Sequence, residues 1–158
     1  MAPAGAVSTP SLWRAARDSP AVLVTGGLYL VGIVLIVFWP VKLDTGVRPI
    51  VEGWLRDAGA DAPGAGSIYS TIEFIANIAV FVPLGALMWW AARVLGLWTP
   101  VILAFLAPLV AEVGQGLFLP DRVPDPRDVV AGMIGVAIGT GVGVLVERSR
   151  RSDATARD

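Results

Sequence analysis

The chain has 158 residues, of which 55% are hydrophobic, with a mean hydropathy of +0.70 and a formal net charge of −1. It contains no cysteine and no histidine, which excludes disulfides, thiol nucleophiles, imidazole general bases and the usual zinc sites. A composition this apolar predicts membrane-spanning segments rather than an ordinary soluble domain. The sequence predicts neither a metal site nor a cofactor.

Four apolar stretches are long enough, or nearly long enough, to cross a bilayer. A spanning helix needs about 20 residues to match a hydrocarbon core roughly 30 Å thick. The sequence therefore predicts an all-α membrane protein with four transmembrane helices, at about 21–39, 68–92, 97–119 and 129–146. The second and third stretches each contain one carboxylate, Glu73 and Glu112, and the other two contain no charge.

Residues 20–147 are predicted to form one transmembrane domain between two disordered ends, a cytoplasmic segment at 1–19 and a charged tail at 148–158. In the first long loop, the stretch "RPIVEGWLRDAG" (48–59) places its apolar residues on one face. That spacing predicts a short helix lying on the membrane surface. This helix could act as a lid over a site or simply as a connector that covers its own apolar face.

The cationic residues predict the orientation in the membrane. Four spans put both termini on the same side, and Arg148, Arg150 and Arg151 directly follow the last span. Because short segments rich in Lys and Arg stay in the cytoplasm, both termini are predicted to be cytoplasmic in the cell membrane. The loops at 40–67 and 120–127 then face outward.

Polar side chains inside or beside the spans gather in the predicted outer half of the membrane. A charge at this depth costs free energy and persists where it has a partner or a function. We therefore predict an outward polar pocket that includes Glu73 as a further candidate. Its principal members are Asn77, Glu112, Gln115, Arg122, Asp125 and Asp128.

Two structural explanations compete with a binding pocket. Glu112 and Arg122 could form an ion pair that holds the third and fourth helices together, and we expect this pair to lie at the centre of the cluster. Asn77 and Gln115 could serve only as interhelical hydrogen-bond partners.

Small residues and prolines predict how the helices pack. Gly135, Gly139 and Gly143 recur every four residues, a spacing that lets two helix backbones approach closely. This face could pack inside the monomer or form the seam of a homo-oligomer. Pro83 and Pro108 interrupt the backbone hydrogen bonds of the second and third spans, and the resulting kinks could open space for the polar cluster.

Taken together, these motifs resemble the VanZ-like family of small bacterial membrane proteins, named for a protein linked to resistance to the glycopeptide antibiotic teicoplanin. The resemblance covers about residues 68–146. It rests on Asn77, Phe81, Pro83 and Gly85, then Glu112 and Gln115, then Arg122, Asp125 and Asp128, then Gly135 and Gly139. The family usually has Asn four residues after the last Asp, where this chain has Gly132.

The resemblance implies a cell-envelope protein with a polar site but implies no particular reaction. The first interpretation is a non-enzymatic protein whose pocket engages a lipid headgroup, a lipid-linked wall precursor or a glycopeptide. An alternative is a membrane-embedded enzyme in which Glu112 or Asp128 acts as general acid or base and Arg122 holds phosphate. A third is a small transporter with a proton relay through Glu112. Neither basic segment interleaves aromatic residues, so nucleic-acid binding is not predicted.

Overall fold

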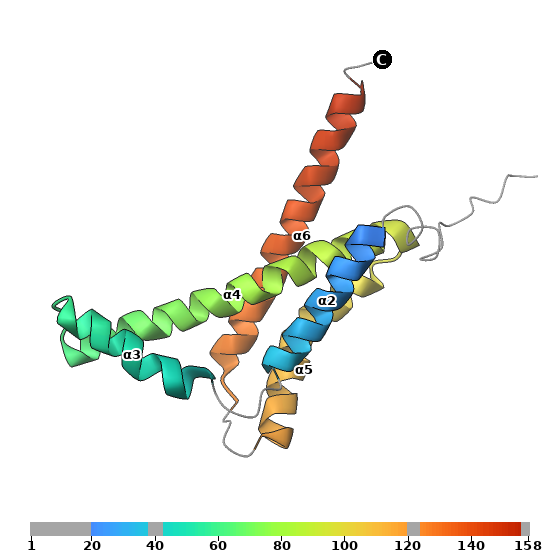
Figure 1. The fold of residues 1–158 in the computed structure, drawn as a ribbon. Coiled ribbons are helices and arrows are strands. Elements are labelled where there is room, and N and C mark those ends of the chain that lie inside the picture. The colour runs from blue at the N-terminus through green and yellow to red at the C-terminus, as the bar shows by residue number, and fades with distance from the viewer. Residues whose placement is uncertain (1–19, 38–42, 120–123, 156–158) are drawn as a thin grey trace, which may run out of the picture.

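The computed structural model describes residues 20–37, 43–119 and 124–155, and these are helical apart from short turns (Figure 1). The helices are α2 (Pro20–Val37), α3 (Leu43–Asp57), α4 (Ala62–Leu95), α5 (Thr99–Phe118) and α6 (Pro126–Thr155). No strand occurs in these residues, so the all-α class is confirmed. Segment 1–19 and Arg122 lie outside the described residues.

Four of the helices are long and apolar enough to cross a membrane, which confirms the prediction of four spans. They are α2, α4, α5 and residues 126–150 of α6. The 34 residues of α4 extend about 51 Å at 1.5 Å per residue, well beyond the thickness of a bilayer core. Figure 1 shows α4 crossing α6 and running obliquely to α2 and α5. A helix of this length must tilt in the bilayer or extend beyond its core.

The start of α4 lies earlier in the chain than the apolar stretch that predicted it. The helix begins at Ala62 rather than near residue 68 because Asp61 caps it, and the Asp61 carboxylate accepts a hydrogen bond from the Gly64 amide at 2.9 Å. Pro63 stands in the first turn, where a missing N–H costs nothing. Gly96, with φ of 67°, ends the helix in the left-handed conformation.

The end of α6 differs from the predicted disordered tail. The helix continues through residues 148–155 as far as Thr155. No proline or glycine interrupts this part of the chain, and the Ser149 hydroxyl bonds the Leu145 carbonyl one turn back. Arg93 of α4 forms a 2.9 Å ion pair with Glu147, which fixes α6 beside α4 just before the charged end.

Glycines set the packing of α4 on α6. A Cβ added to Gly139 would lie closer than 3.0 Å to the carbonyl oxygen of Val82, and one added to Gly135 would meet the Ile78 carbonyl in the same way. On the other helix, Gly85 faces the backbone of α6 equally closely. Since no side chain separates them, the two backbones approach directly. The glycine face of α6 thus packs within the chain.

The short helix α3 packs along the first turns of α4 (Figure 1). Val51 and Leu55 are partly buried, whereas Val47, Ile50 and Trp54 are exposed. The opposite face carries Arg48, Glu52 and Arg56, with Glu52 bonded to Arg48 at 2.8 Å and to Arg56 at 3.0 Å. The hydrogen bond from Arg48 is the main cause of a lowered pKa of Glu52. The helix begins at Leu43, earlier than predicted, and it is amphipathic as the sequence predicted.

Candidate functional site

The end of the bundle where α5 ends and α6 begins, at the bottom of Figure 1, is called the distal end. The described members of the predicted polar set have their contacts there or on the adjoining middle part of α4. Glu112 and Gln115 are three residues apart on α5, and each is only 8% exposed. Glu112 Oε1 accepts a short hydrogen bond from the Asp125 amide just before α6. Gln115 Nε2 donates to the carbonyl oxygen of Val37 at 2.9 Å. The buried polar side chains of α5 thereby hold the start of α6 and the end of α2.

A second contact joins α4 to α6. Asn77 Nδ2 donates to Asp128 Oδ1 at 2.7 Å, in a partly buried position between the two spans. A hydrogen bond to an ionised acceptor is stronger than one between neutral groups. Because the two residues stand 51 positions apart in the chain, this bond fixes the first turn of α6 against the middle of α4.

The first turn of α6 is organised by Asp125. Its carboxylate accepts from the Arg127 amide at 2.8 Å, and its carbonyl accepts from the Asp128 amide at 3.0 Å. These are the bonds of a helix N-cap, in which a side-chain oxygen satisfies an amide that the helix leaves without a partner. Asp125 therefore connects the Glu112 contact to the Asn77–Asp128 contact.

The structure brings five of the six principal predicted residues to the distal end, in two linked sets. Glu112 with Asp125 and Asn77 with Asp128 form these sets, while Gln115 bonds the end of α2 instead. Glu73 lies on α4, one turn before Asn77, and is partly buried. The expected pairing of Glu112 with Arg122 stays a prediction, because Arg122 is outside the described residues.

Three further residues at this end were not predicted to belong to the site, namely Arg127, Ser70 and Phe74. Arg127 Nη1 donates to the Ser70 hydroxyl at 3.0 Å, and the guanidinium carbon lies 5.9 Å from the centre of the Phe74 ring. A signal for this contact was present in the sequence. Ser70, Phe74 and Asn77 follow one another at helical spacing, so they share one face of α4.

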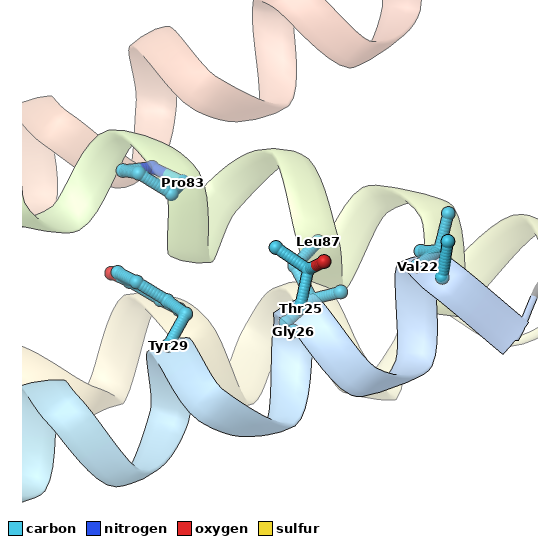
Figure 2. A pocket seen from close by; sticks show the side chains of 7 residues that line it. Val22, Thr25, Gly26, Tyr29, Pro83 and Leu87 are labelled. Atoms are coloured by element: carbon cyan, nitrogen blue, oxygen red, sulfur yellow. The ribbon is translucent and has the colours of Figure 1, made fainter.

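The two prolines have different surroundings. Pro83 lines a cavity of about 460 Å³ between α2 and α4, together with Tyr29 and Leu87 (Figure 2). The Tyr29 hydroxyl donates to the Val80 carbonyl beside this cavity. Pro108 of α5 packs where a Cβ on Gly132 would be, closer than 3.0 Å to it. Gly132, which replaces the usual Asn of the family pattern, thus allows α6 to approach α5. That the proline kinks open space for the polar cluster stays a prediction.

The described residues of the distal end supply carboxylates, side-chain amides, the Ser70 hydroxyl and the Arg127 guanidinium. Among the described residues, no group of three or more acidic side chains could hold a metal ion. The carboxylates of Glu112, Asp125 and Asp128 each accept a hydrogen bond from the protein. Glu112 is enclosed, whereas Asp125 and Arg127 are exposed. The site therefore has an internal floor and an accessible rim.

Comparison with known proteins agrees with this arrangement. A model of the VanZ/LLP1 family matches residues 27–147, more than half of the chain. A search of curated proteins and a search of solved structures found no match. The matched range includes the four spans from Gly27 onward and the whole of the distal cluster. The chain belongs to the VanZ-like family and is a membrane protein of four apolar helices.

Proposed function

We propose that the distal cluster binds the polar headgroup of a membrane lipid or of a lipid-linked wall precursor. The observation that carries the proposal is the Asn77–Asp128 hydrogen bond, which lies partly buried between two spans and directly beside exposed charged residues. Ionisable side chains within a membrane bundle are costly to bury, and they commonly mark substrate or ion sites. The cluster combines such groups with an accessible edge.

The two parts of the cluster have different tasks in this proposal. The buried side chains of Glu112 and Gln115 form the floor, because their hydrogen bonds fix the ends of α2 and α6. The rim consists of Asp125, which directly precedes α6, and of Arg127 and Asp128 in its first turn. Carboxylates accept from hydroxyl and amino groups, and a guanidinium donates to oxyanions, so the rim suits a polar headgroup.

The position of the cluster at the distal end also predicts on which side of the membrane it lies. If both termini are cytoplasmic, as the cationic residues predict, the distal end faces outward, where wall precursors and glycopeptide antibiotics are found. A glycopeptide is the second ligand class of this proposal, since its hydroxyl, amine and carboxylate groups meet the same donors and acceptors. The family name supports this class.

Lipids retained by the purified protein test the proposal. We expect native mass spectrometry in detergent to show a lipid bound to the parent protein. Asp128→Asn keeps an oxygen for Asn77 but removes the charge, and it should weaken retention by about tenfold or more, as expected for loss of a charged hydrogen bond worth about 1.5–3 kcal/mol. Asp153→Asn, in the exposed last turns of α6, is the matched control.

Three results would contradict headgroup binding. The first is a parent protein that retains no lipid, and the second is an equal loss in Asp128→Asn and Asp153→Asn. The third is chemical conversion of an added lipid by the parent, which would favour the enzyme, with Glu112 or Asp128 as its acid or base.

A further inference from the structure

Arg127 is a cation at the distal end that forms no ion pair within the described part of the chain. The ion pairs of the described residues join Arg48 and Arg56 to Glu52, and Arg93 to Glu147. Arg127 takes part in none of them, and its side chain is exposed. A guanidinium in this position is available to an anion from outside the chain.

The same guanidinium is held in place rather than free to rotate. Nη1 donates to the Ser70 hydroxyl at 3.0 Å, and the group lies 5.9 Å from the centre of the Phe74 ring. Attraction between a cation and the face of an aromatic ring adds to the hydrogen bond. An arginine carries five N–H donors, so one bond to Ser70 leaves others for a ligand.

We propose that Arg127, positioned by Ser70 and Phe74, contacts the phosphodiester of a headgroup bound at the distal end. This inference rests on the proposed function and names the ligand class of the same site. The planar guanidinium donates two parallel hydrogen bonds to phosphate oxygens, a geometry that a lysine cannot reproduce. Arg127 stands at the end of a spanning helix, which is the level of lipid phosphates in a bilayer.

The neighbouring carboxylates select the charge of that phosphate. Asp125 and Asp128 flank Arg127 in the same turn, and each already accepts a hydrogen bond from the protein. Their negative charge opposes a doubly charged phosphomonoester more strongly than a singly charged diester. Of these two ligands, the diester is repelled less, so the proposed ligand is a diester, whether it belongs to a lipid or to a soluble molecule.

Lipid binding in phosphate-free maltoside micelles tests the contact. The probes are dioleoylphosphatidylglycerol and dioleoylglycerol, compared by native mass spectrometry on the full chain. We expect the parent to prefer the phospholipid at least tenfold, and Arg127→Gln to weaken phospholipid binding about tenfold. Arg127→Lys should recover part of the loss, and Ser70→Ala should cost about threefold. Arg56→Gln, an exposed cation of α3, is the matched control and should bind as the parent does.

Competition with soluble glycerophosphoglycerol distinguishes the two sources. Displacement of the phospholipid by millimolar soluble diester supports phosphate recognition alone, and no displacement supports recognition of a phosphate that remains attached to its lipid. Phospholipid binding by Arg127→Gln equal to the parent would overturn the inference. If Asp128→Asn still weakens binding in that case, headgroup binding survives and only the Arg127 contact is wrong. A parent that retains no lipid refutes the proposed function itself.

Discussion

Glu112 is a carboxylate inside a spanning helix, and it is buried because a backbone amide satisfies it. The Asp125 amide donates to its Oε1, so the two groups leave water together. Replacing Glu112 with Leu removes the acceptor and leaves that amide without a partner, which should cost about 1–3 kcal/mol of stability. Glu112→Gln keeps an oxygen in place and should cost less. Thermal unfolding in detergent measures both, and equal stability of the two variants would show that the Asp125 contact contributes nothing.

The predicted pairing of Glu112 with Arg122 is open to a separate test at the same scale. If the two charges meet, Glu112→Gln and Arg122→Gln should each be destabilising, and the double variant should lose less than the sum. A double-mutant cycle by thermal unfolding measures the coupling. Additive losses would show that the Glu112 and Arg122 side chains do not interact.

Glu52 gives a prediction for the pH dependence of α3. Its pKa is lowered, first by the hydrogen bond from Arg48. A lowered pKa in the folded state contributes stability above the ordinary glutamate pKa, and this contribution is lost as the pH falls through the folded value. We therefore expect α3 to loosen in acid, with a small amplitude because both arginine partners of Glu52 are exposed to solvent. Trp54 fluorescence measures this, and Glu52→Gln should abolish the acid-dependent change.

At the scale of elements, the α4–α6 interface depends on the absence of side chains. Gly139→Leu would drive its side chain into the Val82 carbonyl and force the helices apart, so we expect a loss of several kcal/mol or failure to fold. The control is Gly141→Leu, since a Cβ at Gly141 meets nothing within 4 Å. Thermal unfolding and gel filtration compare the two. A stable Gly139→Leu protein that loses only dimers would instead place this glycine in a homo-oligomer seam.

A homo-oligomer formed through α6 would need a face of this helix that α4 does not cover. Because Gly135 and Gly139 already contact α4, a second copy would have to pack on the exposed face that carries Ile138, Val142 and Leu145. Large side chains on this face keep backbones farther apart than glycines do. A homo-oligomer through α6 stays a prediction, and its geometry would differ from a close glycine crossing.

At the scale of the whole molecule, the orientation in the membrane remains to be measured. The Arg148–Arg151 cluster and the four spans predict that both termini are cytoplasmic. A phosphatase reporter, which is active only outside the cytoplasm, should be inactive when fused at Asp158 and active when inserted after Gly59. The reverse pattern would turn the distal cluster toward the cytoplasm and remove its access to wall precursors.

The sequence by itself determined the number of spans and the clustering of polar residues toward one end. Both are local properties, because the length of an apolar stretch and the position of a charge within it are read directly along the chain. It also determined the family, because the order and spacing of Asn77, Glu112 and Asp128 can be recognised in the sequence without a structure. The ends of the helices were harder to predict from the sequence. Hydropathy falls where the charged residues begin, near residue 147, but the backbone hydrogen bonds of α6 continue to Thr155.

Only the tertiary structure decided which side chains meet. Asn77 and Asp128 are 51 positions apart, and Gln115 and Val37 are 78 apart, so their hydrogen bonds depend on how α2, α4, α5 and α6 cross. The contact of Arg127 with Ser70 arises in the same way, from the direction in which the first turn of α6 faces α4. Hydropathy does not predict how the helices cross. The crossing of α4 and α6, for example, depends on glycines that let the two backbones come into contact.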